Sequence, residues 1–508
     1  MLSALIWIPM LAAALIGFWP GSVSSKIVRN VAIAIAAITF ILSVILAVQF
    51  DASISQLQFA EFIPWIDALG LNYNLGVDGL SLPLVILNTL LTGVAIYATD
   101  ESIRRPRLYY SLILLITGGV TGAFLSQNLL LFFLFFEVEL IPLYLLIAIW
   151  GGERRGYAAT KFLIYTAFAG IVLLAAFLGT GWLSGASSFD MVGAAGASHL
   201  QGGLPLPLVR QIVLLAGVLL AFGIKMPLVP FHTWLPDAHV EASTPISVLL
   251  AGVLLKLGTY GMLRFGLGLF PEAWAVAAPI LASWAVVSVL YGASCAIAQK
   301  DMKKIVAYSS IAHMGYILLA SAAATPISML GTVLQMVSHG LISGLLFLSV
   351  GVIYKKSGTR NIDVLKGLFN PDRGLPMIGS LMILGVMASA GIPGLAGFIA
   401  EFLMFRGSLP VFPVQTLLCM IGTGLTSVYF LIMVNRAFFG RLSDVVVNLP
   451  QVRWRDRIPS LILAIIIAIM GVQPGVLIAL SEKTAIGIVA NVPPQVKVIA
   501  QNLKENMT

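Results

Sequence analysis

The sequence predicts an all-α polytopic membrane protein with about 14 transmembrane helices. Apolar residues make up 59% of its 508 positions and charged residues only 10%, against roughly 45–50% and roughly 25% in soluble domains. The mean hydropathy is +1.00. The apolar runs are continuous and about 20 residues long, which is the length of a helix that crosses a bilayer. The strands of a membrane β-barrel would instead show short alternating segments. A soluble or a disordered chain is excluded.

Polar and Pro/Gly clusters divide the apolar runs into separate helices. The first run has no basic segment before it, so we expect a spanning helix and not a cleaved signal peptide. Three longer loops, 50–77, 184–208 and 439–456, are too short for a catalytic domain. The predicted helices are 3–19, 27–49, 79–98, 108–125, 128–150, 158–183, 209–232, 245–267, 273–298, 303–323, 326–354, 376–409, 412–438 and 457–480.

Basic residues alternate between the two sides of this helix pattern. The chain carries 29 Lys and Arg against 21 Asp and Glu, and cytoplasmic loops collect positive charge. We therefore expect loops after odd-numbered helices to be cytoplasmic and both termini to lie on the opposite side. The cytoplasmic group is Lys26, Arg29, Arg104, Arg105, Arg107, Arg154, Arg155, Lys161, Lys300, Lys303, Lys304, Lys355, Lys356, Arg360, Lys366, Arg373, Arg436, Arg441, Arg453, Arg455 and Arg457. The opposite group is Arg210, Arg264, Arg406, Lys483, Lys497 and Lys504.

Motifs for a soluble cofactor or a metal are missing from the sequence. The two cysteines, Cys295 and Cys419, lie far apart in apolar runs and form no CxxC, so neither an iron–sulfur cluster nor a disulfide is indicated. There is no Walker motif, and the glycine pairs 179/181 and 422/424 lie in membrane helices and not in a Rossmann turn. His232 and His239 are seven residues apart, which is not a ligand spacing typical of metals. We expect no metal site.

Ionisable residues inside the predicted helices are the functional candidates, because a charge at the bilayer centre is costly. They lie on six helices, as a proton relay requires. Glu137 and Glu139 are two residues apart and point about 200° apart on a helix, so one faces the bundle interior and the other a neighbouring helix or subunit. The alternative for Glu139 and the histidines is a polar contact between helices. The candidates are Glu137, Glu139, Lys225, Lys256, His313, His339 and Glu401.

Two of these helices are predicted to be broken near their charged residue. Pro227 and Pro230 follow Lys225, and Pro393 precedes Glu401 in GIPGLAGF. Proline removes a helical hydrogen bond, and transporters place binding sites at such breaks. The alternative for Lys225 is a lysine that extends to the membrane surface. Lys256 lies about 16 Å into its helix, where this alternative is least plausible.

Several stretches resemble the antiporter-like subunits of respiratory complex I. They are FEVELIPLYLLIAIWGG (136–152), AFGIKMPLVPFHTWLPDAHVEAST (221–244), AGVLLKLGTYG (251–261), AQKDMKKIVAYSSIAHMGY (298–316) and LQMVSHGLISGLLF (334–347). Glu401 occupies a position where the chain L and chain N types carry lysine, so the chain is most similar to the chain M, or chain 4, type. GGERRGYAATKF (151–162) is similar to the cyanobacterial and chloroplast form, and the short start MLSALIWIPM to the variant of carbon dioxide-uptake complexes.

This resemblance implies a domain plan and a set of roles. The plan is N-terminal helices (1–107), two inverted five-helix repeats (108–267 and 273–438) and a C-terminal part (439–508). Glu137 would pair with Lys225, Lys256 and the two histidines would carry the proton, and Glu401 would pass it on. His232, Asp237 and His239 are expected at the cytoplasmic proton entry, and Glu139 in a secondary role, so that its loss should matter less than that of Glu137.

The resemblance also implies a setting for the chain. It would hold no redox cofactor itself, while iron–sulfur clusters, NAD(P)H or ferredoxin, and plastoquinone would belong to other subunits of a complex in the cyanobacterial thylakoid membrane. Partners would be further membrane and peripheral subunits, including chain L-type and chain N-type homologues, with carbonic-anhydrase-like subunits in the carbon dioxide-uptake variant, and no nucleic acid. Two alternatives remain, a subunit of a multi-subunit cation/proton antiporter and a structural spacer that has lost transport.

Overall fold

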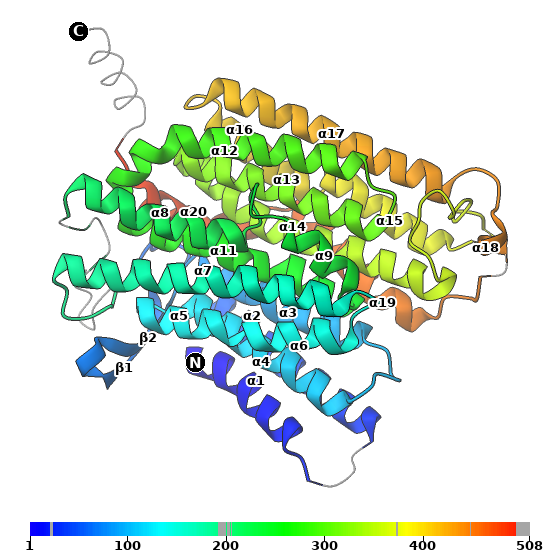
Figure 1. The fold of residues 1–508 in the computed structure, drawn as a ribbon, viewed down its shortest axis with the longest axis horizontal. Coiled ribbons are helices and arrows are strands. Elements are labelled where there is room, and N and C mark those ends of the chain that lie inside the picture. The colour runs from blue at the N-terminus through cyan, green and yellow to red at the C-terminus, as the bar shows by residue number, and fades with distance from the viewer. Residues whose placement is uncertain are drawn as a thin grey trace.

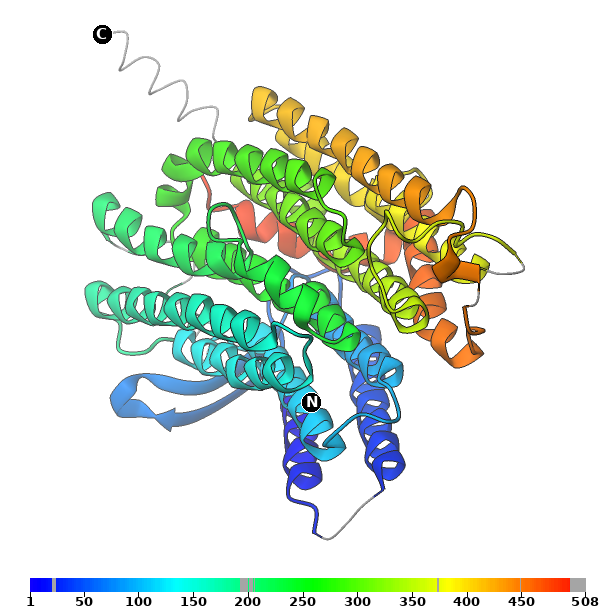
Figure 2. The same cartoon turned by 45° about the vertical axis from the view of Figure 1, so that its right-hand side comes forward.

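A bundle of roughly parallel helices makes up most of the molecule (Figure 1). The computed structural model describes residues 1–20, 24–191, 200, 204, 206–371, 374–447 and 449–493. In both views α1 (Leu2–Gly17) lies at one edge of the bundle and α17 (Pro413–Phe438) at the opposite edge (Figures 1 and 2), and in Figure 2 α2 (Ser25–Gln49) lies beside α1. In this described part, 11 helices are long and apolar enough to cross a membrane, or 12 with one bent pair. The predicted fold class is confirmed.

The remaining helices follow the predicted segments in order. Each predicted segment corresponds to one helix or to a run of adjacent helices. They are α3 (Ser81–Ala98), α4 (Pro106–Leu125), α5 (Leu129–Val138), α6 (Leu140–Trp150), α7 (Arg155–Ser184), α8 (Leu208–Lys225), α9 (Trp234–Glu241), α10 (Thr244–Leu249), η2 (Leu250–Leu254), α11 (Leu255–Gly261), η3 (Met262–Leu267), α12 (Pro271–Ile297), α13 (Met302–Ala323), α14 (Pro326–Ser357), α15 (Pro376–Ser389), α16 (Ala396–Ser408), α18 (Asp444–Val447), α19 (Trp454–Val472) and α20 (Gly475–Val489).

The expected loop 50–77 contains a β-hairpin, which corrects the purely helical prediction. Strands β1 (Gln58–Ile66) and β2 (Leu71–Val77) pair antiparallel around the short helix η1 (Asp67–Leu69). Gly70 has φ +60° and ends that turn, a conformation that glycine adopts without steric cost. The aromatic and β-branched residues of this segment favour strands, but hydropathy alone does not separate such short strands from a loop.

The two predicted helix breaks are confirmed. α8 ends at Lys225 and α9 begins at Trp234, with Pro227 and Pro230 between them. α15 ends at Ser389 and α16 begins at Ala396, with Pro393 between them.

Three further irregularities were not predicted. Glu139 separates α5 from α6, and Pro142, which has no N–H for the Val138 carbonyl four residues before it, explains this break. The span 244–267 contains two π-helical stretches, η2 and η3. The expected single helix 457–480 is instead α19 and α20, which meet at an angle of 69°.

The basic loops meet at one end of the bundle, around a cavity of about 1430 Å³. The ends of α3, α6, α9 and α14 and the starts of α10, α13 and α19 border it. The hairpin lies at the other end of α3, about 27 Å away along 18 residues. The cations that line the cavity all belong to the predicted cytoplasmic group: Arg154, Lys300, Lys303, Lys304, Lys355, Lys356, Arg360, Arg453 and Arg455.

Three cations that the charge pattern assigned to the two sides of the membrane are buried on helices, and one of them, Arg29 on α2, is 7% exposed. Lys303 is in the first turn of α13 and 3% exposed, and Arg264 is in η3 and 4% exposed. Both lie near a helix end, where a residue count cannot separate a loop charge from a buried one. Arg373, Lys497 and Lys504 lie outside the described residues.

Candidate functional site

A buried ion pair joins the broken helix α8 to the break between α5 and α6. Lys225, the last residue of α8, donates from Nζ to Glu139 Oε1. Lys225 is 2% exposed and Glu139 is fully buried. The lysine ammonium also lies 4.8 Å from the centroid of the Phe136 ring. Glu139 Oε2 has no hydrogen-bond partner among the described residues. This oxygen can therefore accept a hydrogen bond from a water molecule.

The hydrogen-bonded partner of Lys225 is Glu139 and not Glu137, the residue to which the resemblance assigns the pairing. The Glu137 carboxylate lies against α7, where a Cβ at Gly170 would overlap it. Glu137 interacts with Lys225 through its charge alone. Two residues apart on nearly helical backbone, the two glutamates point in different directions, so only one of them can contact the ammonium.

A second buried lysine contacts a histidine across two helices. Lys256 lies on α11 and is fully buried, and its Nζ lies 2.7 Å from His339 Nδ1 on α14. Lys256 Nζ also donates to the Ala251 carbonyl at 2.7 Å. Ala251 is in η2, where π-helical geometry changes the usual hydrogen-bond pairing of the backbone. His339 Nε2 has no partner among the described residues.

From His339 the buried ionisable side chains continue to His313 and Glu401. Lys256, His339, His313 and Glu401 are called the buried row below. The two histidine rings have centroids 5.3 Å apart. His313 Nε2 lies 3.7 Å from Glu401 Oε1 and 3.4 Å from the carbonyl of Ser389, the last residue of α15 before the break that precedes α16. Glu401 accepts a hydrogen bond from Thr423 Oγ1 at 3.3 Å and is 4% exposed. Residues from α11, α14, α13 and α16 thus form one continuous row.

The ion pair and the row meet where α11 packs on the end of α8. A Cβ at Gly258 would lie 2.8 Å from the Met226 nitrogen and 3.2 Å from the Lys225 carbonyl carbon. Gly258 therefore allows a backbone approach that a side chain would prevent. Lys256 is two residues before this glycine, so the two buried lysines belong to neighbouring elements.

The residues expected at a proton entry do not form one group. Asp237 is paired with Lys161 at 2.7 Å and is partly exposed. His232 packs edge-on against Tyr291, with ring centroids 5.0 Å apart. His239 is fully buried, its ring stacks on Phe347, and neither ring nitrogen has a partner among the described residues. Of the three, His239 lies deepest.

Lys303 is a buried cation that the sequence analysis missed. Its Nζ donates to the carbonyls of His239 at 3.0 Å and Ala242 at 2.7 Å and to Ser247 Oγ at 3.2 Å. It also lines the large cavity. The signal for it in the sequence is Asp301, which caps α13 through its side chain and thereby places the next residues on the helix instead of in the loop.

The rim of the cavity is held by exposed ion pairs. Lys355 Nζ lies 2.9 Å from Asp100 Oδ2. The hydrogen bond from Lys355, with those from the backbone and hydroxyl of Ser102, holds the pKa of Asp100 well below its usual value. The loop between α3 and α4 is thus tied to the end of α14.

Sequence comparison places the chain among known membrane subunits. The family described as "NADH:quinone oxidoreductase/Mrp antiporter, TM" matches residues 126–427, which include every candidate residue above. The chain belongs to this family. An NAD(P)H-quinone oxidoreductase chain 4 from Microcystis aeruginosa is 44% identical over 86% of this chain and 79% of that protein. A chain 4 from Synechococcus sp. (strain JA-3-3Ab) is 41% identical over 96% of this chain and 93% of that protein.

Solved structures agree with the assignment to the NADH:quinone oxidoreductase/Mrp antiporter family. A chain of respiratory complex I from Thermus thermophilus matches with a TM-score of 0.86 and 28% identity, over 97% of this chain and 100% of that one. A chain of the Mrp complex from Dietzia sp. matches with a TM-score of 0.84 and 21% identity, over 96% and 97%, and shows the fold alone. As the resemblance indicated, the chain is an antiporter-like, multi-pass membrane subunit of the chain 4 type, and its homologues are subunits of NAD(P)H-quinone oxidoreductases.

Proposed function

We propose that this chain carries protons across the membrane through its buried row of ionisable side chains. The observation that carries the proposal is the row itself. Lys256, His339, His313 and Glu401 follow one another at 2.7 Å between Nζ and Nδ1, 5.3 Å between ring centroids and 3.7 Å between Nε2 and Oε1. Histidine and carboxylate side chains exchange protons with their neighbours over such distances directly or through one water.

The Lys225–Glu139 pair controls entry of the proton into this row. A charged lysine and a charged carboxylate stabilise each other, so loss or gain of a proton at one of them changes the charge that Lys256 experiences. Glu137, which interacts with Lys225 by charge alone, adds to this field. Protons enter from the large cavity through the region of Lys303, His239, His232 and Asp237, and Glu401 passes them on.

The setting we propose is the membrane arm of a photosynthetic complex I. Such a complex takes electrons from NAD(P)H or ferredoxin and reduces plastoquinone in the thylakoid membrane, with roles in cyclic electron flow and carbon dioxide uptake. Support comes from the cyanobacterial chain 4 relatives. Iron–sulfur clusters and quinone belong to partner subunits, among them chain L-type and chain N-type homologues and, in the carbon dioxide-uptake version, carbonic-anhydrase-like subunits.

One experiment on the intact assembly tests both parts of the proposal. The tagged chain is extracted in mild detergent, and its native mass and partner subunits are identified. The same preparation carrying Lys256→Ala is reconstituted into vesicles and assayed for proton uptake during quinone reduction. A large assembly with redox subunits, and loss of proton uptake in the variant at normal assembly, are expected. Normal proton uptake by assembled Lys256→Ala would refute the row as the proton path.

A cation/proton antiporter subunit is the second candidate, because an Mrp chain shares the fold. It predicts a small assembly without redox subunits, and transport that depends on sodium. Glu401 in place of the lysine that such antiporter subunits carry argues against it.

A further inference from the structure

A second buried ion pair lies on the other side of Lys256 from the cavity. Arg264 Nη2 is 2.5 Å from Asp78 Oδ2, and the two side chains are 4% and 5% exposed. Arg264 lies on the same helical span as Lys256, eight residues further from the cavity, or about 12 Å along the axis. Arginine keeps its positive charge under all physiological conditions. The proposed proton path does not use this pair.

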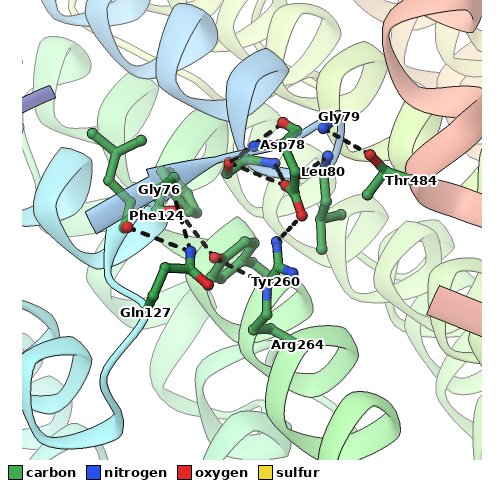
Figure 3. A network of polar contacts seen from close by, with 11 residues as sticks. Gly76, Asp78, Gly79, Leu80, Phe124, Gln127, Tyr260, Arg264 and Thr484 are labelled. Carbon is green, nitrogen blue, oxygen red and sulfur yellow. Dashed lines mark hydrogen bonds and ion pairs between the residues drawn. The ribbon is translucent and has the colours of Figure 1, made fainter. Parts of the chain in front are cut away.

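The pair is the centre of a network that joins four parts of the chain (Figure 3). Asp78 Oδ1 caps the start of α3 by accepting from the Leu80 and Ser81 backbone at 3.1 Å and 3.0 Å. Arg264 Nε donates to the Tyr260 hydroxyl at 3.3 Å, and this hydroxyl donates to the Phe124 carbonyl at 3.0 Å. The network fixes the guanidinium in one position.

The network also reaches the C-terminal helix. The backbone N–H of Gly79, next to Asp78, donates to Thr484 Oγ1 on α20 at 2.9 Å. Gly79 permits this approach, since a Cβ there would overlap the Leu480 carbonyl.

A layer of aromatic rings surrounds Tyr260, which lies between Lys256 and Arg264 on the span 244–267. Tyr260 packs against Phe124, Phe132 and Phe265 with centroids 5.3 Å, 6.3 Å and 6.4 Å apart. Phe222 extends the layer by packing on Phe132 and Phe265. All five rings are fully buried. Rings packed in this way leave little room for a chain of waters.

The two ends of this helical span therefore differ. The Thr244 end borders the 1430 Å³ cavity, whereas the Arg264 end borders a hollow of about 20 Å³ together with Leu267, Gly487 and Asn491. Such a hollow holds about one water. Arg264 borders this hollow, and Tyr260 of the aromatic layer lies on the same span between Arg264 and the buried lysine.

We infer that Arg264, held by Asp78 and Tyr260, is a seal that stops protons from leaving Lys256 toward the hairpin end of the bundle. A fixed positive charge in a narrow passage repels protons, as in other selective channels. With this direction closed, a proton on Lys256 can move only sideways to His339. This inference rests on the proposed function of Lys256 and adds the group that gives transfer its direction.

The competing explanation is that the pair only stabilises the fold, and two substitutions separate the two explanations. Arg264→Gln removes the positive charge and leaves a buried carboxylate, which binds a proton when it has no partner and so can carry one. Asp78→Asn removes the same ion pair but keeps the positive charge, and asparagine still caps α3. A fold-only pair predicts the same result for both, whereas a seal predicts a proton leak only for Arg264→Gln.

The test measures passive proton entry into vesicles that contain the purified complex, without electron donor, under an imposed potential. Arg264→Gln is expected to leak at least about tenfold more than the unaltered complex, a factor equivalent to about 1.4 kcal/mol. Passive proton entry should not rise in Asp78→Asn, nor in Arg436→Gln at the exposed Arg436–Asp363 pair. If Arg264→Gln does not assemble, Asp78→Asn/Arg264→Gln, which leaves no unpaired charge, should still leak more than the unaltered complex, because it too lacks the positive charge.

Three outcomes would overturn the seal. They are no leak in either Arg264 variant, an equal leak in Asp78→Asn and Arg264→Gln, and a leak that persists when Lys256→Ala is added to Arg264→Gln. Failure of the proposed function would look different, because Lys256→Ala alone would then pump protons normally with electron donor present.

Discussion

Glu137 and Glu139 offer a sharp test, because Glu139 makes the contact with Lys225 whereas the sequence analysis assigns the larger role to Glu137. Glu139→Gln keeps the size of the side chain and removes its charge. Lys225 then has no carboxylate contact among the described residues and retains only the Phe136 ring at 4.8 Å and the more distant charge of Glu137. Breaking a buried pair by removing one partner costs about 3–5 kcal/mol, which is a factor of roughly 10²–10⁴ against the charged lysine.

The contribution of the aromatic ring is smaller than this loss. A desolvated cation–π contact is worth about 2 kcal/mol, and it is present before and after the substitution. We therefore expect Glu139→Gln to hold Lys225 in its uncharged form and to reduce proton uptake per electron strongly, with normal assembly. Glu137→Gln, the matched control two residues earlier, removes a charge that does not contact Lys225, so its defect should be the milder one.

Proton uptake by vesicles containing the purified complex, divided by the rate of quinone reduction, gives the relevant ratio for both variants. Blue-native electrophoresis checks that each variant assembles. Equal losses in the two variants would show that contact with Lys225 does not decide the role of a glutamate here. A larger loss in Glu137→Gln would restore the pairing that the family resemblance implies.

Two further predictions concern Lys225 and the rim of the cavity. Lys225→Ala should abolish or strongly reduce coupled proton uptake without loss of assembly, and normal pumping by the assembled variant would exclude the lysine as a carrier. Asp100→Asn should speed hydrogen exchange of residues 99–105 by removing the pair with Lys355, an exposed contact worth at most about 1 kcal/mol. Because its pKa is lowered in the folded chain, the Asp100 contribution is complete above the unfolded pKa of about 3.9 and is lost only as the pH falls below it. The effect of Asp100→Asn on hydrogen exchange of residues 99–105, relative to the unaltered chain, should thus stay constant from pH 7 to pH 5. An effect that fades in this range would contradict the lowered pKa assigned to Asp100.

The membrane fold could be predicted from the sequence because long apolar runs have few alternatives in a bilayer. The breaks at Pro227, Pro230 and Pro393 could also be predicted, because proline removes a specific helical hydrogen bond. The break at Glu139 follows from Pro142 and could have been found by asking which carbonyl lacks its donor. The π-helical turns of η2 and η3 have no comparable signal, because they depend on packing between distant helices.

Residue spacing does not predict which side chains of different helices contact each other. Periodicity shows that Glu137 and Glu139 face different ways, but it does not show which of them meets α8. The burial of Lys303 and Arg264 was not predicted, for a related reason. Both lie within one or two turns of a helix end, and the side-chain contacts that bury them come from residues 60 to 190 positions away in the sequence. Only tertiary structure brings these groups together.

The buried charges coincide with the places where the helices are irregular, and this has a physical reason. Glu139 lies in the break between α5 and α6, Lys225 ends α8, Lys256 bonds a carbonyl of η2, and His313 bonds the last residue before the break between α15 and α16. A regular helix satisfies its own carbonyls and has none to offer a neighbouring charge, whereas an interrupted helix exposes groups that must find a partner inside the protein. Each irregularity therefore lowers the cost of burying a charge beside it. Lys256, His313 and Glu401 are also within reach of one another through His339, so the charges that the irregular turns help to bury belong to one row.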